Sequence, residues 1–325
     1  MSYTQRFLKE FNTLKFVLQN AKNILIVGHS RPDPDAVGST VGFSKFIQKH
    51  YKAKTIVGCY DPFPDNLKNI IPFDKVANPR NLDLTKFDVV IGCDSVDRGF
   101  NKVIEKISKD CVTVVIDHHH DTLTKGDIFI NDGKCSSTCE MLYHFFVFVG
   151  KEIDKDIANA LLAGIIFDTG GFKHSNTSAQ TLAAAADLIK HGASAAKANK
   201  VLSENRDVKT LNLWGKALEH TKFFEKTGLA VTAITQEDIL KYKIKPGEMS
   251  SVASMLTTVP SVRAALVVYQ ADQNLIKGSL RAEKHGNIDV SAIAHQFGGG
   301  GHKLASGFTA PGRIVAQGDG TWKIE

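Results

Sequence analysis

Short apolar runs alternate with amphipathic segments along the first 120 residues. The runs at 23–27, 55–57, 87–92 and 112–116 are rich in β-branched residues and bounded by polar ones, which predicts buried strands. Residues 35–50 place small and apolar side chains at helical spacing, and residues 103–108 are predicted as part of another helix. Strands that alternate with helices predict a doubly wound α/β fold around a parallel sheet.

The pattern changes to helices after residue 136. Helices are predicted over 137–148, 154–167 and 178–189, and the polar segment 175–178 supplies the cap of the last one. Residues 193–224 are predicted as a helical connector, and new strands are predicted at 229–234, 264–269 and 275–280. We therefore expect a first domain at 1–190, a helical linker at 191–210 and a smaller α/β domain with a mixed sheet at 211–325.

Composition is that of an ordinary globular protein, with 43% hydrophobic and 23% charged residues among 325. No apolar run approaches the roughly 18 residues that span a bilayer, and the polar, amphipathic first 23 residues lack a signal-peptide core. We expect a cytoplasmic protein without membrane contact. The net charge of +6 is compatible with an anionic substrate but too small to indicate long nucleic acid.

The five cysteines carry no paired zinc-site spacing and are expected to be ordinary packed thiols. Cys135 and Cys139 are spaced to face each other on a helix, but two thiols do not make a zinc site. Cysteine chemistry is therefore not part of the expected function. The others are Cys59, Cys93 and Cys111.

Carboxylates and imidazoles follow three predicted strands and one predicted helix. They occur in HSRPDPD at 29–35, at Asp94, in VIDHHHD at 115–121, and at Asp168. The carboxyl ends of parallel strands meet at one edge of a sheet, where ligands bind. A single such Asp is more often a cap or turn residue, and Asp35 could cap its own helix, but that explanation is poor for four converging segments.

This set of side chains favours a pair of divalent cations. Asp168 ends an apolar helix, where the dipole is negative, so a cation should offset it. Mixed carboxylate and imidazole ligands suit Mn²⁺, with Mg²⁺, Co²⁺ or Fe²⁺ as substitutes. Two such cations can clamp both oxygens of a phosphoryl displacement.

A second candidate site lies in GGGGHKLASG at 298–307. Consecutive glycines allow the backbone N–H groups to approach an anion closely. A lone glycine run is more often a flexible loop, but His302, Lys303 and the upstream Arg281 favour phosphate binding.

The segments HSRPDPDAVGS, CDSVDRG, VIDHHHD, FDTGGF and GGGGHKLASG together resemble the successive motifs of the DHH phosphoesterases with a DHH-associated C-terminal domain. The resemblance covers nearly the whole chain and is strongest to the stand-alone nano-RNase and pAp-phosphatase group. It implies a metal-dependent hydrolase that removes mononucleotides from the 5′ end of short oligonucleotides such as nanoRNA and pApA, and that also dephosphorylates pAp. It further implies a homodimer.

The resemblance also assigns roles to residues. One metal would be held by His29, Asp33 and Asp94, and the other by Asp35, Asp94, His118 and Asp168, with Asp94 bridging. Pro34 stands where the family usually has glycine, which should stiffen the loop without removing a ligand.

The remaining roles concern the substrate. Asp117 would orient His118, while His119 would contact the scissile phosphate with help from Arg98. The terminal phosphate would be held by Arg281, Gly299, Gly300, Gly301 and His302.

Other readings of the same motifs stay open. They are a cyclic di-AMP phosphodiesterase, a processive single-strand exonuclease of the RecJ type, and a non-catalytic nucleotide sensor. The exonuclease is disfavoured because the sequence lacks an additional oligonucleotide-binding domain, and the sensor because every ligand position is filled. A manganese pyrophosphatase is disfavoured by the glycine-rich segment, and a synthetase editing domain by the N-terminal metal set. The substrate among nanoRNA, short DNA, pAp, pApA and cyclic di-AMP is not fixed by the sequence.

Overall fold

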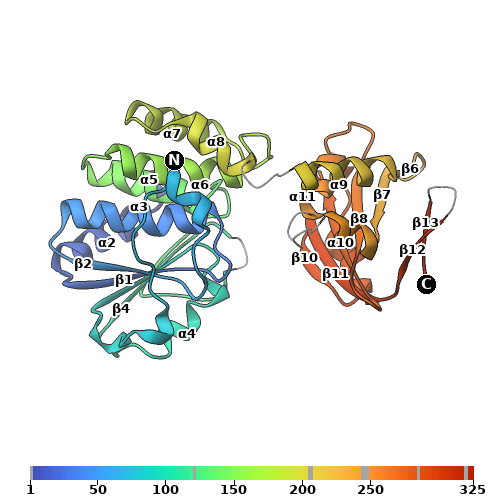
Figure 1. Ribbon diagram of the computed structural model, residues 1–325. Coiled ribbons are helices and arrows are strands. Elements are labelled where there is room, and N and C mark those ends of the chain that lie inside the picture. Colours follow the sequence, from blue (N-terminus) through green and yellow to red (C-terminus); the bar gives the residue numbers. More distant parts are fainter. Residues whose placement is uncertain (1–2, 120–121, 204–207, 243–248, 284–285, 318–320) are drawn as a thin grey trace. The chain divides into compact units, whose positions relative to one another are not determined.

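The structure is a computed structural model that describes residues 3–119, 122–203, 208–242, 249–283, 286–317 and 321–325. The chain divides into two compact units, residues 1–204 and 205–325 (Figure 1). The division falls inside the range expected for the linker, 191–210. His120 and Asp121 of the VIDHHHD segment lie outside the described residues.

A parallel sheet with the strand order β2-β1-β3-β4-β5 forms the centre of the first unit. Its strands are β1 (Asn23–Gly28), β2 (Lys54–Gly58), β3 (Val89–Cys93), β4 (Val112–Asp117) and β5 (Ile128–Asn131). The predicted parallel α/β architecture is confirmed, and the first four strands lie where the apolar runs placed them. The sequence pattern did not predict β5, which has only four residues of alternating burial.

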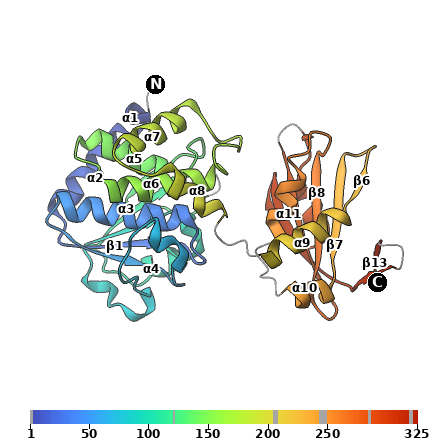
Figure 2. The same cartoon turned by 45° about the horizontal axis from the view of Figure 1, so that its top comes forward.

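Helices lie on both faces of the parallel sheet, with α4 (Asn101–Ile104) on the face opposite a larger helical layer (Figures 1 and 2). Ile24 and Ile26 of β1 contact the core beneath the larger helical layer, whereas Leu25 and Val27 pack with Phe100 and the short helix α4 on the opposite face. The larger layer contains α2 (Leu8–Asn20), α3 (Pro34–His50), α5 (Thr138–Val149), α6 (Lys155–Asp168) and α7 (Ala179–Lys190), joined by α1 (Tyr3–Arg6) and α8 (Ala195–Ser203).

Side-chain caps fix where these helices begin. Asp33 caps α3 by accepting hydrogen bonds from the N–H groups of Asp35 and Ala36, so Asp35 itself is not the cap. Ser137, Asp154 and Ser178 cap α5, α6 and α7 in the same way, the last within the predicted segment 175–178. The prediction that residues 103–108 are helical is wrong beyond residue 104, because α4 (Asn101–Ile104) is followed by turns.

The second unit is built on a six-stranded mixed sheet with the order β10-β11-β9-β8-β7-β6, as predicted for the smaller domain. Among the described strand pairs of this second sheet, only β7 and β8 run parallel, and the other pairs are antiparallel. Helices α9, α10 and α11 cover one face and α12 packs on the other. The bounds are β6 (Lys222–Phe224), β7 (Leu229–Ile234), β8 (Ala264–Asp272), β9 (Leu275–Ala282), β10 (Gly300–His302), β11 (Ala305–Pro311), α9 (Val208–Glu219), α10 (Gln236–Tyr242), α11 (Met249–Leu256) and α12 (Val290–Gln296), with a hairpin of β12 (Ile314–Ala316) and β13 (Trp322–Ile324).

The expected helical connector at 193–224 is therefore three different elements. Its first part, α8, packs against α6 of the first unit, and its second part, α9, belongs to the core of the second unit. Its last three residues form strand β6, so the helical prediction is wrong there. Across the described part of the chain, every helix is either too short or too polar to cross a membrane.

Candidate metal centre

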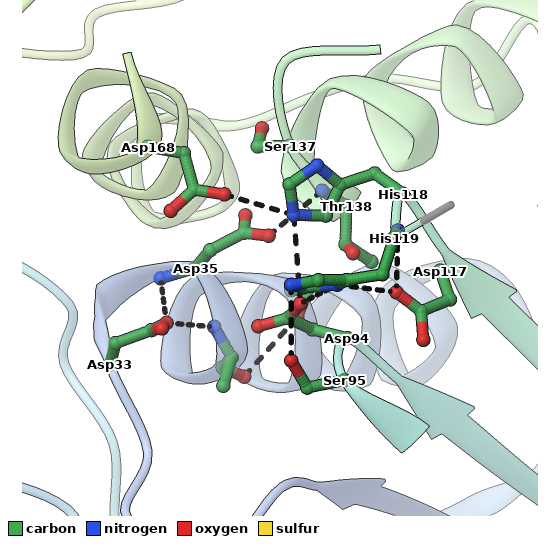
Figure 3. Close-up of polar contacts among 12 residues, drawn as sticks. Asp33, Asp35, Asp94, Ser95, Asp117, His118, His119, Ser137, Thr138 and Asp168 are labelled. Atoms are coloured by element: carbon green, nitrogen blue, oxygen red, sulfur yellow. Dashed lines mark hydrogen bonds and ion pairs between the residues drawn. The ribbon is translucent and has the colours of Figure 1, made fainter. Parts of the chain in front are cut away.

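The predicted ligands converge at the carboxyl edge of the parallel sheet, where the strand order reverses between β1 and β3. His29 follows β1, Asp94 follows β3, and Asp117 ends β4 just before His118 and His119. Asp33 and Asp35 lie at the start of α3, and Asp168 is the last residue of α6 (Figure 3). All six predicted metal ligands are thus brought to one place.

The first donor group contains His29, Asp33 and Asp94, whose ligand atoms lie within 4.8 Å of one another. His29 is buried, and its Nδ1 lies 2.7 Å from the carbonyl oxygen of Ser30. When Nδ1 carries the proton of that hydrogen bond, Nε2 keeps a free lone pair. Nε2 lies 3.5 Å from Asp33 Oδ2 and 3.4 Å from Asp94 Oδ2, yet it has no hydrogen-bond partner among the described residues.

Asp94 connects this group to a second one. Its Oδ2 faces His29, whereas its Oδ1 lies 3.8 Å from His118 Nε2. Asp94 is 2% exposed, and Oδ1 accepts no hydrogen bond from the described part of the chain. A buried carboxylate oxygen without a donor is costly, so the position calls for a cation. The two oxygens of Asp94 therefore face different donor groups.

The second donor group contains Asp35, His118 and Asp168. His118 Nε2 lies 3.1 Å from Asp168 Oδ2. Asp35 is fully buried and accepts hydrogen bonds from the N–H groups of Thr138 (2.8 Å) and Cys139 (3.0 Å) at the first turn of α5. The positive end of that helix favours the ionised carboxylate, but burial and Asp94 oppose it and raise the pKa of Asp35 to about 7. Burial and the charge of Asp35 likewise raise the pKa of Asp168 to about 8.

These observations fit a pair of divalent cations. Four carboxylates share a small, largely buried space with two imidazoles, and although burial opposes the charged ring, the carboxylates raise the pKa of both His29 and His118 to about 10, which shows how strongly the space favours positive charge. The two unpartnered atoms, His29 Nε2 and Asp94 Oδ1, each belong to this ligand set. Oxygen and imidazole donors suit manganese and its neighbours.

Asp117 holds His119 and not His118, so the predicted pairing is wrong. Its Oδ1 accepts hydrogen bonds from the backbone N–H of His119 (3.0 Å) and from His119 Nδ1 (2.8 Å), and its Oδ2 accepts one from the N–H of Val96 (3.1 Å). The physical reason is the turn after β4, which directs His118 toward Asp168 and leaves His119 beside Asp117 (Figure 3).

Three further residues support the site and were not singled out from the sequence. Ser95 Oγ lies 3.3 Å from His119 Nε2. Asn131 Nδ2 donates to the carbonyl oxygens of Asp117 and His119, both at 2.8 Å. Asp97 accepts from the N–H groups of Leu123 and Thr124, which fixes the chain after the histidines. Ser95 follows Asp94 directly and could have been noticed, whereas Asn131 belongs to the strand that the pattern missed.

Arg98 has a weaker connection to the centre. Its carbonyl oxygen accepts a hydrogen bond from the N–H of Ser30 (3.2 Å), and its side chain is exposed. Its role at the scissile phosphate remains a prediction.

The second unit gathers the predicted phosphate-binding residues on neighbouring strands. Arg281 of β9 is opposite Ala305 of β11, which in turn is opposite His302 of β10, so the three backbone positions form one row. The guanidinium of Arg281 donates to the carbonyl oxygen of Leu280 (3.0 Å), and partial burial lowers its pKa. The side chain of His302 lies outside what the structure describes.

Two glycines of this segment cannot be replaced without a clash. A Cβ at Gly299 would lie 2.2 Å from the carbonyl oxygen of Gly307. A Cβ at Gly301, where φ is +141°, would lie 2.6 Å from that of Ala305. Glycine is thus required for the close approach of β10 to β11, and β10 is an edge strand whose outer backbone groups are unpaired within the sheet.

Comparisons with known proteins cover most of the chain. The model of the N-terminal domain of the DHH family matches residues 23–165, and the DHHA1 domain model matches residues 226–317. The chain is 28% identical to the bifunctional oligoribonuclease and PAP phosphatase NrnA of Bacillus subtilis, over 87% of this chain and 88% of that protein. It is 30% identical to the uncharacterized protein MG371 of Mycoplasma genitalium, over 95% of this chain and 92% of that protein.

A solved structure shows the same fold. The crystal structure of an exopolyphosphatase-related protein from Bacteroides fragilis matches with a TM-score of 0.84 at 23% sequence identity. The match covers 93% of this chain and 91% of that one.

Proposed function

Because this chain belongs to the DHH family and carries a DHHA1 domain, we propose that it hydrolyses short oligonucleotides such as nanoRNA and pApA from the 5′ end to mononucleotides. We include dephosphorylation of pAp as a second activity of the same centre. The observation that carries the proposal is Asp94, whose two oxygens face two separate donor groups at the sheet edge. The bifunctional oligoribonuclease and PAP phosphatase of Bacillus subtilis supports this choice of substrates.

Two divalent cations, with Mn²⁺ as the expected metal, complete the centre in this proposal. His29, Asp33 and Asp94 would hold one, and Asp35, Asp94, His118 and Asp168 the other. When bound, such a pair neutralises charge on the phosphate and lowers the pKa of water. The protein contributes the preorganised ligands: the hydrogen bond to Ser30 orients His29, and two N–H groups of α5 orient Asp35.

His119 contacts the scissile phosphate in this proposal. Its ring is 30% exposed, held at Nδ1 by Asp117 and at Nε2 by Ser95. When its Nε2 carries a proton, this fixed imidazole can exchange the contact with Ser95 for a hydrogen bond to a phosphoryl oxygen where negative charge grows during the reaction. Arg98 assists from the adjoining turn.

The second unit holds the terminal phosphate of the substrate. Arg281 offers a planar set of donors that matches two phosphate oxygens, and the edge strand Gly300–His302 lies in the same row of the sheet, whereas the N–H groups of Gly298 and Gly299 already donate to His295 and Ala294. A separate anchor for a terminal phosphate favours substrates that carry such a group.

The test is hydrolysis of a matched set of substrates by the full-length protein in the presence of Mn²⁺. The set contains pApA, a five-nucleotide RNA, pAp and cyclic di-AMP. We expect release of AMP from pApA, shortening of the RNA from its 5′ end, and release of phosphate from pAp. Selective opening of cyclic di-AMP would instead assign the protein to second-messenger turnover, and no turnover of any substrate would favour the sensor.

Two variants separate the metal centre from the anchor. Asp94→Asn should lower turnover of every substrate by on the order of 100-fold or more. Loss of a residue that only hydrogen-bonds to a metal ligand already costs up to about 100-fold, and Asp94 is proposed to be a ligand itself. Arg281→Gln should mainly raise KM. A fully active Asp94→Asn variant would exclude the bridging role, and an unchanged KM in Arg281→Gln would exclude the anchor.

A further inference from the structure

A second cluster of metal-ligand types lies in the first unit and shares no residue with the centre described above. The Sγ of Cys135, a carboxylate oxygen of Glu140 and a ring nitrogen of His144 all lie within 4.8 Å of one another. Glu140 and His144 are one turn apart on α5, and Cys135 precedes that helix. Cys135 and Glu140 are 6% and 2% exposed, so water does not satisfy them.

Hydrogen bonds already fix one half of the Glu140 carboxylate. Its Oε2 accepts from the N–H and Oγ of Ser136 and from Oγ1 of Thr181. Its Oε1 is left facing His144 Nε2 at 3.6 Å, too far for a hydrogen bond. This geometry holds one carboxylate oxygen rigidly toward the imidazole, as a metal ligand needs to be held.

A buried polar atom of the cluster lacks a partner. His144 Nε2 makes no hydrogen bond to any residue that the structure describes. Tyr3 is 8% exposed, interacts with Cys135 through its hydroxyl, and stacks on His144 with ring centroids 4.5 Å apart. Native proteins satisfy nearly all such buried groups, so the unpartnered His144 Nε2 indicates a missing occupant.

The neighbouring charges are compatible with a cation. Asp132, whose carbonyl oxygen accepts from the N–H of Cys135, is 4% exposed and ion-paired with Arg6. The carboxylate of Glu140 has no lysine or arginine partner among the described residues. Its negative charge can therefore be balanced by a cation bound in the cluster.

We propose that Cys135, Glu140 and His144 bind one thiophilic divalent cation of the zinc class. Thiolate, imidazole and carboxylate are the usual zinc ligands, whereas hard cations such as Mg²⁺ and Ca²⁺ avoid sulfur. The three protein ligands leave a fourth position for water. Because Thr138 and Cys139 of the same helix turn hold Asp35, the cation fixes a segment that also orients a ligand of the catalytic centre.

The test uses Co²⁺, added to the chelator-treated full-length protein and followed by absorption. Cobalt bound by a thiolate gives a charge-transfer band in the near ultraviolet, whereas the oxygen and imidazole ligands of the catalytic centre give none. We expect this band to saturate at the intensity of a single thiolate-bound cobalt, whatever cobalt the catalytic centre also binds, and to disappear in Cys135→Ser. His144→Ala should weaken the cobalt affinity of this site by about tenfold or more.

Two matched variants make the result specific. Cys139→Ser removes a thiol that lies 3.6 Å from the carbonyl oxygen of Asp35, and Asp94→Asn damages the catalytic centre. The band should persist in both. Absence of the band in the unaltered protein, or its persistence in Cys135→Ser, would overturn the proposal. Far-ultraviolet circular dichroism of each variant shows whether a lost band reflects lost folding, and His144→Ala then gives the independent answer.

Discussion

Three residues at or near the candidate centre have a positive φ, a backbone conformation that residues other than glycine rarely adopt. Asp94 and Ser95 follow each other with φ of 62° and 40°, and Arg31 has φ of 57°. Such conformations cost about 1 kcal/mol or more each unless the surroundings hold them. Here the N–H of Asp94 donates to the carbonyl oxygen of Ile116, and the N–H of Arg31 donates to the Asp61 carboxylate. The strain therefore turns Asp94 and Ser95 toward the ligand cluster.

The pairing of Asp117 with His119 gives a prediction at this scale. Asp117→Asn keeps the shape of the side chain but removes the charge that fixes the imidazole, so turnover of pApA should fall by about 10- to 100-fold. In a His119→Ala background the same substitution should change turnover by much less, since the group that it positions is gone. Steady-state kinetics of the two single variants and the double variant form the required cycle. Independent, multiplying effects would show that Asp117 acts elsewhere.

The convergence of His29, Asp94 and His118 could be predicted from the sequence, because each directly follows a buried parallel strand and must lie at the carboxyl edge of the sheet, whatever its rotamer. Position alone does not place Asp33, Asp35 and Asp168, which lie at helix ends. The partner of Asp117 could not be predicted, because two adjacent histidines differ only in the direction that the turn gives them. Ser95 could have been noticed because it follows Asp94 directly, but nothing in its residue type indicates the left-handed conformation that it adopts.

The elements around the centre are packed closely enough to control its geometry. Helices α3 and α6 approach each other at glycines: a Cβ at Gly38 would lie 2.4 Å from the carbonyl oxygen of Ala160. A Cβ at Gly164 would lie 2.4 Å from Cys139 Sγ and 2.6 Å from Asp35 Oδ1. The candidate ligand Asp35 is thus enclosed by α3, α5 and α6 together. Short elements with weak patterns, such as β5 and β6, escaped prediction because neighbouring strands define them more than their own residues do.

Gly164→Ala tests whether this helix packing supports the centre. The added methyl group must displace Cys139 or Asp35, so we expect a loss of about 1–3 kcal/mol in the free energy of unfolding and a lower metal affinity. Gly215→Ala on α9 is the matched control, because a Cβ there meets nothing within 4 Å. It should stabilise the helix by about 0.5–1 kcal/mol. Urea unfolding and Mn²⁺ titration measure both quantities, and equal behaviour of the two variants would contradict the packing argument.

At the scale of the whole molecule, each unit has hydrophobic clusters of its own. The clusters of the first unit surround its parallel sheet, and those of the second pack on its mixed sheet. Every ligand of the candidate metal centre belongs to residues 1–204, whereas both tryptophans, Trp214 and Trp322, belong to the second unit. Metal binding should therefore stabilise one unit, and tryptophan fluorescence should report on the other.

The pH dependence of the metal-free protein follows from the raised pKa values of Asp35 and Asp168. In the folded unit these carboxyl groups keep their protons to about pH 7 and 8, whereas their ordinary pKa is 3.8. Between the ordinary pKa of 3.8 and the raised values of about 7 and 8, the folded state binds more protons than the unfolded state. The free energy of unfolding therefore falls as the pH rises from about 4 to about 8. Divalent cations take the place of these protons, and their stabilising effect should be larger at about pH 8 than at about pH 6.

Thermal unfolding with and without Mn²⁺ checks both expectations. At a metal concentration 100 times the dissociation constant, each bound cation adds about 2.7 kcal/mol, so that for a unit of this size one cation raises Tm by about 5–10 °C. We expect this shift in the calorimetric transition of the first unit, more strongly at the higher pH, and little change in the transition followed by tryptophan fluorescence. Asp94→Asn should lose most of the calorimetric shift, because it removes the ligand common to both donor groups. A metal-dependent shift of equal size in the fluorescence transition would instead show that the two units unfold together, since Trp214 and Trp322 are remote in sequence from every ligand.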